Sequence, residues 1–144
     1  MPLTLHDLPL GQEFSCGAFT LTEAEIIAFA MAYDPQPWHL DDAAARLTYF
    51  GGLCASGLHS QGAAIGLVVR AIADVAIIAG GSLHEARFFV PVRPNRPYRV
   101  SATWVSARPS ASNSARGVAA IAIMARDEAG VAVMECGVTY IVGR

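Results

Sequence analysis

An apolar segment at residues 57–78 constrains the fold more than any other part of this 144-residue sequence. Its aliphatic residues recur on nearly every side of a helix drawn through it, and such a helix belongs inside a protein. Ser56 precedes the segment as a capping residue, and Gly80-Gly81 follows it as a terminator. The sequence therefore predicts a long buried helix around which the rest of the chain wraps.

Strands are predicted on both sides of this helix. One strand precedes it at 13–19, and four follow it at 83–90, 98–107, 116–125 and 131–142. Proline-rich or glycine-containing turns separate these four strands, and Asp127-Glu-Ala-Gly130 is typical of a hairpin. Short connections predict antiparallel neighbours. We therefore expect an α+β fold, with residues 1–144 forming a single domain in which an antiparallel sheet wraps around a central helix.

Composition bears on the partners of this domain. Apolar residues make up 53% of the chain and charged residues 15%, so it is more hydrophobic and less charged than an average soluble domain. A buried interface between copies would account for both values, so we expect an oligomer, with its size, dimer or higher, left open by composition. The net charge is −2 and the basic residues are scattered, which argues against a nucleic-acid partner.

The cysteines and the N-terminus indicate the compartment. Cys16, Cys54 and Cys136 are widely spaced without a C-x-x-C pair, which predicts neither disulfides nor a zinc site and fits a reducing cytoplasm. The start, MPLTLHDLPL, lacks the basic residues and apolar core of an export signal. The longest apolar stretch, 71–79, contains Asp74 and is far shorter than the roughly 20 residues of a membrane span. We expect no membrane association.

A helix is predicted between the first strand and Asp34. Thr20-Leu-Thr-Glu23 and Thr22-Glu-Ala-Glu25 both offer a capping box, and Pro35 opposes continuation of the helix beyond Asp34. The following Pro35-Gln-Pro37 stretch should be an extended loop that carries Trp38 and His39. Beyond it, Asp41 or Asp42 could cap a short helix that ends before Gly51-Gly52.

Asp34 and His39 are the first candidate functional pair. A carboxylate and an imidazole on one proline-stiffened loop could converge on a small target, orient a water molecule and move its protons. The alternative is structural: Asp34 would cap the helix end while His39 packs on Trp38. Chemistry alone does not separate these two interpretations.

The second candidate is the loop that opens the apolar helix, Phe50-Gly-Gly-Leu-Cys-Ala-Ser-Gly57. First-turn N–H groups of a helix lack partners within it and favour negative charge, so an oxyanion could lie there. Glycine at position 57 would let a ligand carbonyl approach the backbone closely. The alternative is that these glycines only allow the chain to turn within a loop and bind no ligand.

Together the two segments resemble a known family. Asp34-Pro-Gln-Pro-Trp-His-Leu-Asp41, followed by Phe50-Gly and Ala55-Ser-Gly57, resembles the hydratase motif of MaoC-like dehydratases, the R-specific enoyl-CoA hydratase family. Ala86-Arg-Phe-Phe-Val-Pro-Val-Arg93 resembles that family's later strand and turn. The resemblance covers nearly the whole chain. It implies a hotdog fold, in which a sheet curls around a helix and two copies commonly join their sheets in a homodimer.

The resemblance also implies an activity. Members add water to an enoyl-CoA, or remove it from a 3-hydroxyacyl-CoA, without a metal or redox cofactor. Asp34 and His39 would then activate the water, and the Gly57 N–H would hold the thioester oxygen. The predicted substrate-binding residues are Trp38, Phe50, Ala55 and Ser56, together with Arg87 and Arg93, whose guanidinium groups could meet the phosphates of coenzyme A.

Two departures from the family pattern keep other functions open. Gln36 stands where many relatives have Asn, and Ser56 stands where many have His; a serine can cap the helix but cannot act as a base. The competing functions are a hotdog thioesterase, in which water attacks the carbonyl, and a non-catalytic acyl-CoA-binding subunit. His59, in the first turn of the helix, is expected to pack rather than to react.

Overall fold

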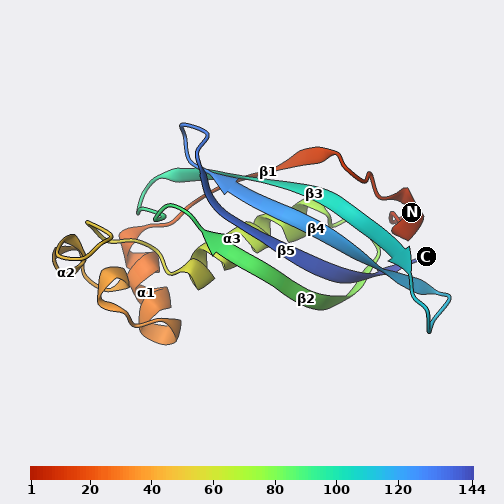
Figure 1. Cartoon of the computed structure of the whole chain (residues 1–144), viewed down its shortest axis with the longest axis horizontal. Coiled ribbons are helices and arrows are strands. Elements are labelled where there is room, and N and C mark those ends of the chain that lie inside the picture. The colour runs from red at the N-terminus through yellow and green to blue at the C-terminus, as the bar shows by residue number, and fades with distance from the viewer.

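The computed structural model describes residues 1–144 and contains a five-stranded antiparallel sheet packed on one long helix (Figure 1). Helix α3 (Gly57–Ala71) contacts β1, β3, β4 and β5 from one side of the sheet. The predicted α+β class, with a sheet around a central helix, is confirmed. The strand order is β1-β3-β4-β5-β2, and the strands are β1 (Glu13–Thr20), β2 (Ile77–Phe88), β3 (Pro97–Pro109), β4 (Arg116–Arg126) and β5 (Ala132–Gly143).

The two shorter α-helices lie beyond one end of the sheet (Figure 1). Helix α1 (Glu23–Tyr33) begins after Thr22, whose side chain accepts the N–H of Glu25, and ends at Asp34 as predicted. Helix α2 (Asp42–Arg46) is capped by Asp41. Two single 3₁₀ turns complete the set, η1 (Leu5–Asp7) and η2 (Pro37–His39). Trp38 and His39 therefore lie in a turn that begins at Pro37, and only the residues before it are extended.

The predicted extent of the long helix is wrong. Helix α3 ends at Ala71, Ile77 already belongs to β2, and Gly80-Gly81 lies inside that strand rather than at a helix end. The reason is a long-range contact, because the N–H of Leu3 donates to Asp74 O and the carbonyl of Leu3 accepts from Ala76 N. Local apolar periodicity could not distinguish the end of a buried helix from the start of a strand.

The predicted pairing of the two strands after the helix is also wrong. β2 pairs with β5, at the other edge of the sheet from β1, and not with β3. Residues 89–96, which connect β2 to β3, are instead bound to two other loops: Asn95 N donates to Leu21 O, and Val92 O accepts from Ala55 N. The β3–β4 and β4–β5 pairs and the turn at Asp127 are confirmed.

Burial differs between the two sides of α3. Ser60, Ala64 and Val68 are buried on the side that meets the sheet, whereas Leu58 and Val69 remain 57% and 47% exposed. The prediction of a helix buried on all sides is therefore wrong for a single chain. Leu83, on the edge strand β2, is 66% exposed as well. None of the helices reaches the length and apolar character that a membrane crossing requires.

Candidate active site

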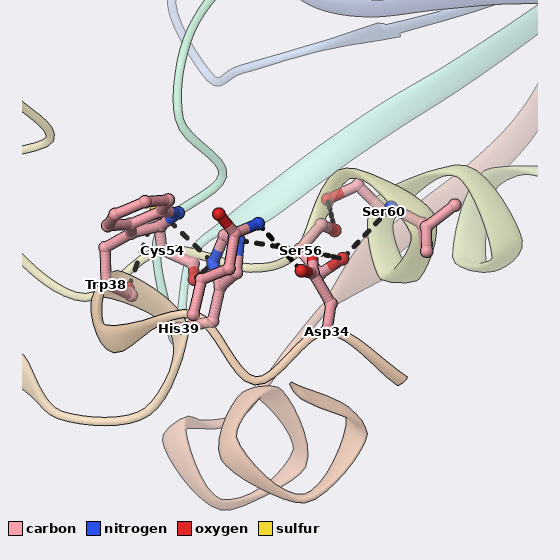
Figure 2. Close-up of polar contacts among 8 residues, drawn as sticks. Asp34, Trp38, His39, Cys54, Ser56 and Ser60 are labelled. Carbon is pink, nitrogen blue, oxygen red and sulfur yellow. Dashed lines mark hydrogen bonds and ion pairs between the residues drawn. The ribbon is translucent and has the colours of Figure 1, made fainter. Parts of the chain in front are cut away.

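Asp34 and His39 are brought together by the exit from α1. Asp34 closes the helix through its N–H, which donates to Ala30 O, and its own carbonyl accepts from Gln36 N. The turn at Pro37 then reverses the chain, so that His39 Nε2 lies 3.5 Å from Asp34 Oδ2. Figure 2 shows the two side chains facing each other.

The other ring nitrogen sets the tautomer of His39. Its Nδ1 lies 2.7 Å from the carbonyl oxygen of Cys54. A carbonyl can only accept a hydrogen bond, so Nδ1 carries the hydrogen in this arrangement. In the neutral ring Nε2 is then an acceptor whose lone pair faces Asp34. The imidazole is buried, which restricts it to this orientation.

Two side chains hold the Asp34 carboxylate. Ser56 Oγ donates to Oδ2 at 2.7 Å, and Gln36 Nε2 donates to Oδ1 at 2.7 Å. The hydrogen bond from Ser56 is the largest cause that lowers the pKa of Asp34, with Gln36 and the charge of His39 adding to it and desolvation opposing it. Asp34 is therefore held as a carboxylate, the form that can accept a proton.

A cavity of about 460 Å³ opens in front of this pair. Asp34, His39 and Gly57 all line it, and its walls are mostly apolar. Trp38, Phe50 and Ala55, three of the predicted substrate-binding residues, also line it. The remaining wall comes from distant segments: Tyr49, Cys54, Leu58, Ser60 and the stretch from Phe88 to Val92, with Gln36 at the polar end.

One N–H at the N-terminus of α3 is free, and its residue lines this cavity. The N–H of Leu58 donates to Ser56 Oγ, and those of His59 and Ser60 donate to Ser56 O, but the N–H of Gly57 has no acceptor within the chain. A side chain at position 57 would also collide with Phe88, because a Cβ there would lie 2.7 Å from Phe88 Cζ. Glycine at position 57 thus leaves room for the Phe88 ring beside the free N–H.

Residues 8–123 match the protein family described as MaoC like domain. The chain belongs to this family. A MaoC-like dehydratase from Rhodospirillum rubrum is 34% identical, with 99% of this chain and 97% of that chain covered at a TM-score of 0.89. A monoamine oxidase regulatory protein from Archaeoglobus (24% identity, 99% and 95% covered, TM-score 0.90) and an R-hydratase from Pseudomonas aeruginosa (20%, 98% and 86%, TM-score 0.76) share the hotdog fold.

Three predicted substrate-binding residues of this MaoC-like domain do not line the cavity. Ser56 is fully buried beneath Asp34, at 0% exposure, because the helix cap places its hydroxyl between the carboxylate and the Leu58 N–H. The Arg93 guanidinium donates to backbone carbonyls of the loop before α3. Arg87 is exposed on β2 and pairs with Glu85.

Several cavity residues were not predicted from the sequence. Phe88 ends β2, and Phe89 and Val90 follow it; all three line the cavity together with Asp34 and His39. The available signal was two adjacent aromatic residues at the end of a strand, since neither is buried in the core and both are about half exposed. The local pattern could not show that this strand end meets the start of α3.

Other reactive groups of the MaoC-like domain are less suited to chemistry. His59 stacks on Phe29 with ring centroids 4.5 Å apart and lies outside the cavity lining, so it packs as predicted, and burial lowers its pKa. Burial raises the pKa of the Cys54 thiol, and the nearby His39 Nδ1 already donates to the Cys54 carbonyl. No group of three or more His, Cys, Asp or Glu residues could hold a metal ion.

Ser56→Ala is expected to raise the pKa of Asp34, because it removes the hydrogen bond that contributes most to lowering it. Asp34 would then take up its proton at a higher pH as the solution is acidified. A ¹³C NMR titration of the aspartate carboxyl groups measures this shift. Ser60→Ala is the matched control, since its hydroxyl is also buried but donates to Ser56 O. An unchanged Asp34 titration in Ser56→Ala would contradict the role of that hydroxyl.

Proposed function

We propose that this MaoC-like domain is a hydro-lyase that adds water across the double bond of an enoyl-CoA thioester, or removes it from the 3-hydroxyacyl-CoA. One observation carries the proposal: two hydrogen-bond acceptors, Asp34 Oδ2 and His39 Nε2, lie 3.5 Å apart on a cavity that is also lined by Gly57, whose N–H has no acceptor within the chain. The hydratase and dehydratase named among its structural relatives support the same chemistry.

The acceptor pair suits a water molecule. A carboxylate oxygen and an imidazole lone pair repel each other unless a donor lies between them, and water supplies two O–H donors. A water held by Asp34 and His39 would present its oxygen lone pair to the cavity. As it attacks, the pair can accept its proton, a step that typically contributes roughly 10²- to 10⁴-fold to a rate.

The N–H of Gly57 would act at the other end of the substrate. A thioester oxygen that accepts this hydrogen bond gains negative charge as the enolate develops, and the positive end of the α3 dipole favours that charge. One such donor is typically worth about 3 to 4 kcal/mol in the transition state. The same polarisation makes C3 electrophilic, so binding and chemistry are linked through one contact.

The proposed step balances with water alone. The C3–O bond forms, the C2=C3 double bond breaks, and the proton removed from water is returned to C2, with Asp34 and His39 as the carriers. No oxidant, reductant or metal enters this scheme, and coenzyme A takes part only as the thioester of the substrate. The largely apolar cavity wall suits an acyl chain.

We extend the proposal to a cytoplasmic homodimer. Strand β2 leaves one edge without a partner strand, and both Leu83 on it and Val69 on α3 are exposed. Pairing of two β2 edges would cover such groups, and free strand edges are rarely left bare. The three cysteines are unpaired, which suits a reducing compartment. Sedimentation equilibrium measures the oligomeric state.

A panel of enoyl-CoA thioesters of different chain lengths tests the function. We expect water-dependent loss of the absorbance of the conjugated thioester, with the 3-hydroxyacyl-CoA as product and no free thiol. Release of coenzyme A thiol from the same substrates would instead indicate a thioesterase. Binding of every thioester without loss of conjugation would indicate a non-catalytic subunit and would reject the proposed activity.

A further inference from the structure

The loop at residues 50–56, which we call the strap, connects two parts of the site. Its Cys54 carbonyl accepts the hydrogen bond that orients His39, and its last residue, Ser56, holds Asp34 and caps α3. The strap has neither helical nor strand structure of its own. Its position must therefore be fixed by contacts with other segments.

Arg93 supplies the side-chain donors for the first half of the strap. Its Nη1 donates to Gly52 O at 2.8 Å and lies 3.4 Å from Leu53 O, and its Nη2 donates to Phe50 O. No backbone N–H donates to any of these three carbonyls. The guanidinium comes from the turn after β2, where the N–H of Arg93 itself donates to the hydroxyl of Tyr98 at 2.7 Å.

Asp42 binds the same stretch as a hydrogen-bond acceptor, whereas Arg93 binds it as a donor. Its Oδ1 accepts the N–H of Leu53 at 2.9 Å, and this bond is the largest cause that lowers the pKa of Asp42. The strap is thus held by a donor that binds its carbonyls and an acceptor that binds an N–H. The rest of the strap is anchored by backbone bonds, from Cys54 N to Trp38 O and from Ala55 N to Val92 O.

We propose that Arg93 is a positioning residue that sets the geometry of His39 and of the Gly57 N–H through the strap. This inference rests on the proposed hydration and replaces the prediction that Arg93 binds coenzyme A phosphates. The guanidinium is absent from the lining of the acyl cavity, and its donors are directed to the strap. Arginine suits the task because its planar fork reaches several carbonyls at once, whereas lysine offers one compact ammonium group.

Arg93→Met tests this role against phosphate binding. It removes all three donor contacts but leaves the backbone anchors of the strap, so we expect a folded protein. A displaced His39 should lower kcat by roughly 10- to 100-fold while the KM for the acyl-CoA stays near its original value. A raised KM with unchanged kcat would overturn the proposal, because it is the result expected for a phosphate ligand.

The matched control is Arg108→Met, which removes an exposed arginine from β3 that makes no side-chain hydrogen bond and does not line the cavity. Its kcat and KM should equal those of the unaltered protein. Arg93→Lys is the second variant, since it retains the charge and aliphatic stem and lacks only the fork. If Arg93→Met fails to fold, Arg93→Lys carries the same comparison, with a smaller loss of kcat expected.

An NMR measurement separates this inference from the proposed function. Histidine ¹⁵N spectra of the full chain contain four ring systems, and the His39 signals are identified by their loss in His39→Ala. We expect one tautomer, protonated at Nδ1, in the unaltered protein and in Arg108→Met. Arg93→Met should show shifted His39 signals or a mixture of tautomers, and Arg93→Lys should show a smaller change of the same kind. Unchanged His39 signals in Arg93→Met would overturn the positioning role even if no hydratase activity were found.

Discussion

Asp34→Asn should lower the rate of enoyl-CoA hydration by roughly 10²- to 10⁴-fold, the range typical of a lost acid–base group. The amide has nearly the same shape as the carboxylate but cannot take a proton from water at neutral pH. It also replaces one acceptor by a donor between Ser56 and Gln36, which both donate to Asp34. Hydration is measured as the loss of conjugated thioester absorbance.

The matched control for Asp34→Asn is Asp74→Asn. Asp74 is exposed, makes no side-chain hydrogen bond and does not line the cavity. It should retain the original rate, and the far-UV circular dichroism of both variants should be unchanged. A rate near the original in folded Asp34→Asn would remove the carboxylate from the mechanism and, with it, the proposed hydration site.

His39→Ala is expected to reduce the rate to a similar degree, because it removes the second acceptor of the water. It should also destabilise the protein by about 1 to 3 kcal/mol, since the buried carbonyl of Cys54 loses its donor. Kinetics on the thioester panel measure the first effect, and denaturant unfolding measures the second. His6→Ala is the control, as His6 is exposed and does not line the cavity.

The double variant tests whether the two residues act on one water. If they do, the double variant should lose much less of its hydration rate than the product of the two single fold-losses, because the water is already released after the first change. Independent, multiplicative losses would mean that Asp34 and His39 serve different steps. Such a result would require a different division of roles between them.

Much of the site followed from local sequence. Pro35 fixed the end of α1 at Asp34, and the proline-led turn limited where His39 could lie, so their approach depends on a few adjacent residues. Ser56 was recognisable as a cap because a hydroxyl before an apolar helix satisfies its first N–H groups. Its second bond, to Asp34, was not predictable, since it joins residues 22 positions apart.

Other features depended on contacts between distant segments. Arg93 was predicted to bind coenzyme A phosphates, yet its guanidinium donates to carbonyls some 40 residues earlier in the chain. The aromatic wall formed by Phe88 and the early end of α3 have the same cause. The residues around a position do not indicate which distant loop will supply an acceptor or which strand edge will remain free.

By itself, the sequence determined the class of elements, the caps, and the short path that brings a carboxylate and an imidazole to one turn, because these depend on backbone preferences and on hydrogen bonds between near neighbours. Only the tertiary structure decided the partner of β2, the length of α3, the burial of Ser56 and the contacts of Arg93. Each of these is set by which surfaces meet after the chain has collapsed, and close packing between remote residues leaves no local pattern from which to read it.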